Sequence, residues 1–142
     1  MIRRATVKDF RRIRKLERRC FARPLRKEQL RGLLMNPNAH SLVFSEGRRL
    51  VASLILYCEG PSVKVLTVAV DPAFRRRGIG RMLMLEAEKI ARWLKVPRMT
   101  LEVSTGNSPA IGLYTTLGFR FEGVIENYYA WQDDAYLMAK QI

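Results

Sequence analysis

The sequence predicts a single α+β domain over residues 1–142, built as three layers with a mixed sheet of about seven strands between about four helices. Short apolar, β-branched runs bounded by Gly, Pro or Asp recur along the chain, which is the pattern of strands. Between two of these runs, residues 79–94 carry apolar side chains at helical spacing. A helix that joins two strands favours their parallel pairing, so the sheet is expected to be mixed.

Seven segments are predicted as strands, and the residues between them indicate how they connect. Gly47 lies between the second and the third and favours a hairpin, while Pro61 marks the turn before the fourth. Pro72 ends the fourth, because proline cannot donate to a strand ladder. The last two are expected to close the sheet as a hairpin. The predicted strands are residues 2–5, 41–45, 50–59, 63–70, 99–103, 119–125 and 135–140.

Four segments are predicted as helices from their periodicity and their end signals. Thr6 with Asp9 three residues later forms a capping pattern, Pro24 suits the first turn of the second helix, and Gly118 ends the fourth. The predicted helices are residues 7–20, 24–36, 79–94 and 109–117. The side chains of the first helix expected to pack on the sheet are Val7, Phe10, Ile13, Leu16 and Cys20.

Positive charge is concentrated near the N-terminus. The net charge is +13, and residues 1–31, with thirteen Lys or Arg and three acidic residues, contribute +10 of it. Such a face is more commonly a solubilising surface, and the alternative is a contact for a polyanion. For the helix near residues 8–19 the first candidate partner is ribosomal RNA, followed by acidic protein or lipid headgroups. The cations opposite the apolar stripe of this helix are Lys8, Arg11, Arg12, Lys15, Arg18 and Arg19.

Composition also limits the class of protein. No apolar stretch is long enough to cross a bilayer, so we expect no membrane insertion and a cytoplasmic location. Cys20, Cys58 and His40 do not form a metal-ligand pattern, so no metal site is expected. The two cysteines are instead expected to be small buried apolar residues.

A glycine-rich basic loop lies where the fourth predicted strand gives way to the third helix. At a helix N-terminus the first backbone N–H groups have no partner within the helix, which favours a bound anion. Glycine allows close approach to the main chain, and arginine adds charge-assisted bonds to phosphate. The spacing of residues 75–81 matches neither the dinucleotide-binding fingerprint nor a P-loop.

Arg75, Gly78 and Gly80 occupy the positions of the Arg/Gln-x-x-Gly-x-Gly/Ala signature, and this loop therefore resembles that of the GCN5-related N-acetyltransferases (GNAT). The resemblance implies the GNAT fold and acetyl-CoA as co-substrate, with its pyrophosphate held by backbone amides of the loop. The residues that it assigns to acetyl-CoA are Val68, Ala69, Val70, Arg75, Arg76, Arg77, Gly78, Ile79, Gly80 and Arg81, with Asn107 on the pantetheine arm.

A second region resembles the same family. Asn107, Ala110, Leu113-Tyr114 and Gly118-Phe119 match the signature Asn-x-x-Ala-x-x-Leu-Tyr-x-x-x-Gly-Phe. Together with the tail at residues 127–138, this region looks like the ribosomal-protein-alanine N-acetyltransferase (RimI) branch. The chain departs from that branch at Glu126, where arginine is usual, and at Ala130, which replaces a proline.

The resemblance assigns the chemistry to two side chains. Glu102 matches the general base that removes a proton from the acceptor amine, and Tyr114 matches the general acid that protonates the departing thiolate. Taken singly, each residue is better explained as a surface carboxylate or a packed aromatic ring, whereas the two signatures together favour the catalytic roles. Tyr128 and Tyr129 either pack in the terminal hairpin or shape the entrance for the acceptor.

The sequence therefore predicts an N-acetyltransferase whose preferred acceptor is a protein N-terminal α-amine. The ordinary pKa of an α-amine is about 8 against about 10.4 for lysine, so a carboxylate deprotonates it at lower cost. Lysine or a small-molecule amine is the alternative acceptor. A non-catalytic module that binds CoA or RNA is the alternative class.

Overall fold

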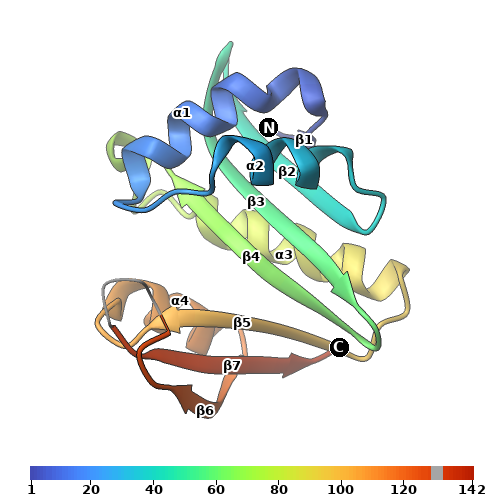
Figure 1. The fold of residues 1–142 in the computed structure, drawn as a ribbon, viewed down its shortest axis with the longest axis vertical. Coiled ribbons are helices and arrows are strands. Elements are labelled where there is room, and N and C mark those ends of the chain that lie inside the picture. The colour runs from blue at the N-terminus through green and yellow to red at the C-terminus, as the bar shows by residue number, and fades with distance from the viewer. Residues whose placement is uncertain (129–132) are drawn as a thin grey trace.

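The computed structural model describes residues 1–128 and 133–142 and confirms the predicted class (Figure 1). The seven strands form one sheet in the order β1-β2-β3-β4-β5-β7-β6, which is antiparallel except for the β4–β5 pair. The elements are β1 (Ile2–Arg4), a 3-10 turn (Val7–Asp9), α1 (Phe10–Cys20), α2 (Lys27–Met35), β2 (Ala39–Glu46), β3 (Arg49–Glu59), β4 (Ser62–Val70), a 3-10 turn (Pro72–Phe74), α3 (Ile79–Trp93), β5 (Arg98–Ser104), α4 (Ser108–Thr116), β6 (Arg120–Ile125) and β7 (Ala135–Gln141).

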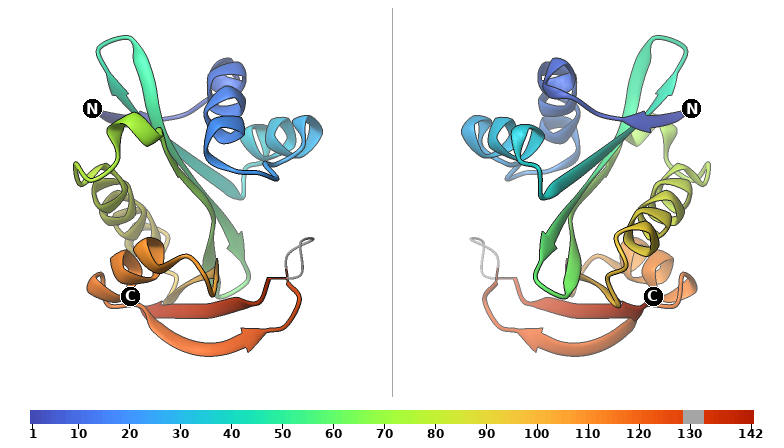
Figure 2. Two further views of the ribbon diagram at one scale, coloured as in Figure 1. Left: turned by 90° about the vertical axis from the view of Figure 1, so that its left-hand side faces the viewer. Right: turned by 90° about the vertical axis from the view of Figure 1, so that its right-hand side faces the viewer.

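Helices cover both faces of the sheet, with α1 and α2 on one side and α3 and α4 on the other (Figure 2). The core under α1 and α2 is the smaller of the two, and its largest fully buried side chains include Ile13, Leu30 and Ile55. The core under α3 and α4 contains Leu83 and Leu101, both almost fully buried. None of the helices in the described ranges is long and apolar enough to cross a membrane.

The first two helices begin later than predicted. Val7 belongs to a 3-10 turn and is 45% exposed, so the prediction that it packs in the apolar stripe was wrong. Pro24 precedes α2, which begins at Lys27 after a cap in which the Gln29 side chain accepts the Arg26 backbone N–H. Burial of Leu30, one turn into the helix, fixes where α2 contacts the sheet.

The β4–β5 pair separates partway along both strands. Pairing runs from Ser62–Arg98 to Val65–Leu101, although β4 continues to Val70 and β5 to Ser104. At this point the register between β3 and β4 shifts, which leaves one extra residue in β4. A bulge of this kind bends its strand and increases the local twist. The bend therefore turns the last part of β4 away from β5 (Figure 1).

The N-terminal cap predicted from Thr6 and Asp9 is present. The Asp9 carboxylate accepts the Thr6 backbone N–H at 2.9 Å and two hydrogen bonds from the Arg3 guanidinium, and Arg12 lies 2.8 Å from it. Although Asp9 is 2% exposed and burial opposes ionisation, the Arg3 hydrogen bonds lower the pKa of Asp9 to about 2. The carboxylate thus joins β1 to α1 as a buried charge with its partners in place.

We expect Asp9→Asn to reduce the loss of stability in acid. The pKa of Asp9 is about 2 in the folded protein, compared with 3.8 for the free side chain, which stands for the unfolded chain. Its stabilising contribution, about 2 kcal/mol, is therefore complete above about pH 4 and is lost as the pH falls through about 2. Urea unfolding between pH 5 and pH 2 should show a shallower decline for Asp9→Asn than for the parent. The exposed carboxyl variant Glu46→Gln is the control, and parallel curves for Asp9→Asn and the parent would contradict the assignment.

Candidate active site

The end of β4 presents free backbone groups toward the gap between β4 and β5. The backbone N–H of Asp71 bonds Val51 in β3, and in an antiparallel ladder such bonds alternate along the strand. Val68 and Val70 therefore direct their N–H and C=O groups away from β3, and no β5 residue pairs with them. The C=O of Val70 accepts Arg75 Nε at 3.0 Å and Cys20 Sγ at 3.3 Å, which agrees with this orientation. The N–H groups of Val68 and Val70 are left available to a ligand.

The glycine-rich loop ends in free N–H groups at the start of α3, as predicted. Gly78 is the N-cap in a left-handed conformation (φ 78°), and Arg76 before it is also left-handed (φ 64°). The first intrahelical bond recorded in the described chain runs from Met82 N–H to Gly78 C=O, so the preceding amides point out of the helix end. A Cβ at Gly80 would lie 3.5 Å from Leu113 of α4, so the helix start lies against α4.

The four arginines of this loop have different environments. Arg75 donates its Nε–H to the Val70 C=O at the surface, and the Arg77 guanidinium lies 4.8 Å from the centroid of the Phe74 ring. Arg76 and Arg81 are not recorded in an ion pair with any residue that the structure describes. The loop therefore combines backbone donors with cations that are not held in recorded ion pairs, which is a suitable site for a pyrophosphate.

Asp71 anchors this loop, and the sequence analysis did not identify it as a site residue. It is 2% exposed and accepts the Ala73 backbone N–H at 3.0 Å, Arg19 at 3.0 Å and Arg49 at 3.1 Å. The bond from Ala73 lowers the pKa of Asp71 against the effect of burial, and Arg19 lowers it further. Through one carboxylate, the loop is connected to α1 and to the start of β3.

On the other side of the gap, α4 carries two predicted site residues. Asn107 is its N-cap, with Oδ1 accepting the Ala110 N–H at 3.3 Å, while its amide nitrogen can donate to a ligand. Tyr114 is buried at 9% exposure, and its ring centroid lies 6.0 Å from that of Phe119. Both therefore lie on the helix that contacts the start of α3.

Glu102 projects from the face of β5 that lies away from α3 and α4. Leu101 and Val103 belong to the core under α3 and α4, so strand alternation turns Glu102 toward the side of α1 and α2. Tyr114 packs in the core under α3 and α4 and thus lies on the other face. The two predicted catalytic residues do not meet directly. A group placed in the opening between β4 and β5 would instead have one of them on each side.

Glu102 forms an ion pair that the sequence analysis missed. Its Oε1 lies 2.5 Å from Nζ of Lys64 on β4, and the side chains are only 12% and 21% exposed. The pKa of Lys64 is raised, because the hydrogen bond to Glu102 and its charge outweigh the lowering effect of burial. Tyr128 interacts with both groups, and its pKa is raised by burial first and then by the charge of Glu102. The sequence did contain a signal for this pair, because Lys64 and Glu102 are opposite charges on the same face of two neighbouring strands.

A second carboxyl lies on α1 beside β4. Glu17 is 1% exposed, and its Oε2 accepts the Thr67 hydroxyl at 2.6 Å. Burial raises the pKa of Glu17, and the hydrogen bond from Thr67 opposes the rise. Its Oε1 has no hydrogen-bond partner among the described residues. Glu17 thus joins α1 to the part of β4 that faces the gap.

Three further predictions concern residues near this region. Cys20 and Cys58 are free thiols of intermediate burial, so the prediction that both are buried was wrong. Tyr129 lies outside the described residues. Within the described ranges, no group of three His, Cys, Asp or Glu side chains is placed to hold a metal ion.

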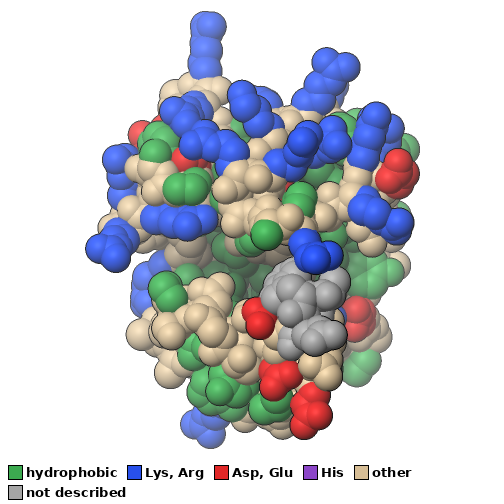
Figure 3. Space-filling model, turned by 60° about the vertical axis from the view of Figure 1, so that its left-hand side comes forward, with side chains coloured by type: hydrophobic (Ala, Val, Ile, Leu, Met, Phe, Trp, Pro, Cys, Tyr) green, Lys and Arg blue, Asp and Glu red, His purple; other side chains and the backbone are tan. Residues whose placement is uncertain are grey.

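The surface between these elements is hollowed. In Figure 3, the hollow lies below the face on which Lys and Arg side chains gather, and hydrophobic side chains are visible within it. The site therefore combines a strand edge with free amides, a helix N-terminus suited to an anion, and two titratable side chains on opposite faces of the sheet.

Comparison with known proteins identifies the class. Residues 9–119 match the model of the acetyltransferase (GNAT) family. The chain therefore belongs to the GNAT family and is an N-acetyltransferase, which confirms the class predicted from the two signatures.

Individual relatives agree with the predicted RimI-like branch. The chain is 28% identical over 139 residues to a putative [ribosomal protein bS18]-alanine N-acetyltransferase of Bacillus subtilis, an alignment that covers 96% of this chain and 92% of that protein. Several other relatives are matched over only about half of their length, 46% to 55%. The crystal structure of the Escherichia coli ribosomal-protein-S18-alanine N-acetyltransferase superposes with a TM-score of 0.93 at 26% identity, covering 100% of this chain and 93% of that one. Arabidopsis thaliana NAA60, solved in complex with acetyl-CoA, has the same fold (TM-score 0.89, 21% identity, coverage 100% and 98%).

Proposed function

We propose that this chain transfers the acetyl group of acetyl-CoA to the N-terminal α-amine of a protein, with a ribosomal protein as the first candidate. The observation that carries the proposal is the opening between β4 and β5, which has Glu102 on one face and Tyr114 on the other. The names of the bacterial relatives support this acceptor. Such a substrate also agrees with the expected cytoplasmic location.

The proposed acetyl-CoA site uses backbone groups already described. Its pyrophosphate is placed at the free amides of residues 78–81, where the helix dipole and the arginines favour negative charge. The pantetheine arm is placed along the free edge of β4, with the amides of Val68 and Val70 as donors and the Asn107 amide nitrogen opposite. Bound there, acetyl-CoA supplies the activated acyl group.

We assign the general base to Glu102. An α-ammonium must lose a proton before it attacks, and a carboxylate at the gap can take it directly or through a water. Lys64 pairs with Oε1, which orients the carboxylate toward the neighbouring strand. Tyr128, which interacts with this pair, is 42% exposed, so it is suitably placed to line the path of the acceptor. A role for Tyr129 remains a prediction from the sequence.

We assign the general acid to Tyr114. A phenol, with an ordinary pKa of about 10, can protonate a departing thiolate, and a position on α4 places it on the side of the gap opposite Glu102. The developing negative charge on the carbonyl oxygen is assigned to a backbone N–H at the end of β4. Thus each catalytic step has a donor or acceptor from this chain.

A peptide panel tests the proposed acceptor. Peptides that differ in their first residue, with a free or blocked α-amine and with or without lysine, are incubated with acetyl-CoA and analysed by mass spectrometry. Acetylation of free α-amines alone is expected. Acetylation of blocked, lysine-containing peptides would favour the lysine alternative, and binding of CoA without transfer to any peptide or small amine would favour the non-catalytic module.

We expect Gly80→Glu to weaken acetyl-CoA binding at least tenfold, because a carboxylate at this position opposes the pyrophosphate. A Cβ here makes ordinary contacts with Leu113 and Val70, so the helix itself should tolerate a side chain. The control is Gly32→Glu on α2, which has open space at its Cβ. Calorimetry that finds equal affinity in Gly80→Glu and the parent would show that the pyrophosphate binds elsewhere.

We expect Glu102→Gln to lower turnover about 100-fold and to weaken its rise with pH. This change also leaves Lys64 without its ionic partner, so the double variant Lys64→Met/Glu102→Gln is the matched control. If Glu102 is the base, the double variant stays as slow as the single one under conditions where chemistry limits the rate. Recovery of turnover in the double variant would mean that Glu102 only neutralises Lys64.

We expect Tyr114→Phe to lower turnover at least tenfold while acetyl-CoA affinity changes little, since the hydroxyl acts on the leaving group rather than on binding. The ring remains to pack against Phe119, which keeps the core under α4 filled. Single-turnover kinetics and calorimetry measure the two quantities separately. Unchanged turnover would remove Tyr114 from the catalytic residues.

A further inference from the structure

The surface of α1 that faces away from the sheet borders a cavity of about 590 Å³. We call this cavity the basic groove. Every charged side chain that lines it is positive, and Phe10 is the remaining lining residue. The cations come from two helices, and they are Arg11, Arg14, Lys15, Arg18 and Arg19 of α1 with Lys27 and Arg31 of α2.

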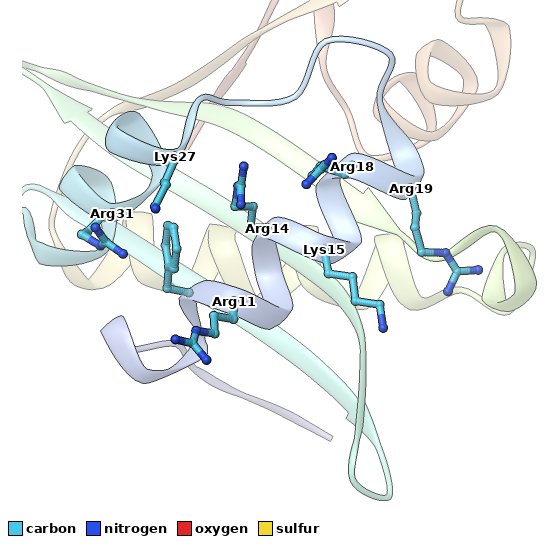
Figure 4. Close-up of a pocket in the computed structure, with 8 residues that line it drawn as sticks. Arg11, Arg14, Lys15, Arg18, Arg19, Lys27 and Arg31 are labelled. Carbon is cyan, nitrogen blue, oxygen red and sulfur yellow. The ribbon is translucent and has the colours of Figure 1, made fainter.

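The cations are spread along the groove rather than gathered at one point. Those of α1 recur every three or four residues, so successive groups are separated by one helical turn, about 5.4 Å. Figure 4 shows Arg14 and Lys27 between the two helices, whereas Arg11, Lys15 and Arg19 extend to the other side of α1. The Arg31 guanidinium lies 4.5 Å from the centroid of the Phe10 ring, which keeps it over the groove. This arrangement fits an extended ligand that carries repeated negative charges.

Most of these cations have no acidic partner in the parts of the chain that the structure describes. Arg12, outside the groove on the same helix, pairs with Asp9, and Arg19 at the groove's end pairs with Asp71. The other six groove cations form no ion pair with a described residue. Like charges at i,i+4, as in Arg14 and Arg18, destabilise a helix. Folding therefore gains nothing from this pattern of charge.

The groove lies close to the candidate active site. The same helix that carries the cations on its outer side carries Glu17 and Cys20 on its inner side, where they bond Thr67 and Val70 of β4. A helix with its side chains is about 10 Å wide, so a ligand in the groove would lie within a short distance of the gap between β4 and β5. Figure 3 shows the Lys and Arg side chains gathered on the part of the surface above the hollow.

We propose that the basic groove binds a single strand of RNA through its phosphates. A concave surface lined by two helices fits a single strand better than a flat bilayer. Unpaired cations at each turn match the regular charge of a phosphodiester chain better than scattered acidic side chains of a protein. The choice of RNA over single-stranded DNA rests on the proposed ribosomal-protein substrate. The inference that the groove binds a single nucleic-acid strand does not depend on that substrate.

The test compares two triple variants that lose the same charge. The groove variant is Arg14→Gln/Lys15→Gln/Lys27→Gln, and the control variant is Lys89→Gln/Lys95→Gln/Arg120→Gln, whose changes lie on α3, the turn after it and β6. Binding of a labelled 12-nucleotide RNA is measured by fluorescence anisotropy between 50 and 300 mM KCl. Thermal melts establish that each variant is folded, and Lys15→Gln/Lys27→Gln replaces the triple variant if it is not.

The groove variant should bind RNA at least tenfold more weakly than the parent at 50 mM KCl, and the control variant should bind nearly as well as the parent. The slope of log K against log[KCl] should become less steep by about 2, from three lost phosphate contacts at about 0.7 each on a single strand. Binding should not depend on base sequence. Equal losses in the two variants would show a net-charge effect and overturn the proposal, as would unchanged binding in the groove variant.

Two further measurements separate this proposal from its alternatives. Binding of poly-glutamate and of vesicles containing anionic lipid is measured in the same way. If the parent binds either of them more tightly than RNA, and the groove variant loses that binding, the groove belongs to that ligand and the proposal is overturned. Acetylation of a free peptide is measured on the same variants. The groove variant should keep peptide acetylation while losing RNA, so failure of the RNA proposal and failure of the proposed enzymatic function give different results.

Discussion

The candidate site depends on one feature of the sheet: β4 and β5 stop pairing at Val65 and Leu101, although both strands continue. The bulge in β4 bends this strand at the point where pairing ends. Unpaired N–H groups inside a protein are costly unless a ligand or water satisfies them. The same bend thus opens the sheet and leaves backbone N–H groups of β4 that need a hydrogen-bond acceptor from a ligand or water in the opening.

Charged side chains stabilise the walls of this opening without filling it. Asp71 connects the glycine-rich loop to Arg19 and Arg49, and Lys64 holds Glu102 on the neighbouring strand. Both carboxylates are largely buried, so removal of a partner would leave a poorly solvated charge. These ion pairs therefore hold the glycine-rich loop and the candidate base in place.

Helix α1 contributes to the molecule on both of its sides. Its inner side packs Ile13 and Leu16 in the core and directs Glu17 toward β4. Its outer side carries the repeated cations of the basic groove, which neither the core nor the acetyl-transfer chemistry requires. A change in the outer cations therefore leaves the packing of the inner side intact, which makes docking and catalysis separable by mutation.

Local sequence patterns were enough to predict the succession of strands and helices along the chain, the glycine-rich loop at the β4–α3 junction and the face of β5 on which Glu102 lies. These features follow from local patterns: alternation, helical periodicity, and end signals such as Thr6 and Gly118. Tertiary structure alone decided where β4 leaves β5, that Lys64 meets Glu102, and that cations of α1 and α2 share one groove. Those features depend on register and packing between segments far apart in the chain, which local patterns do not specify.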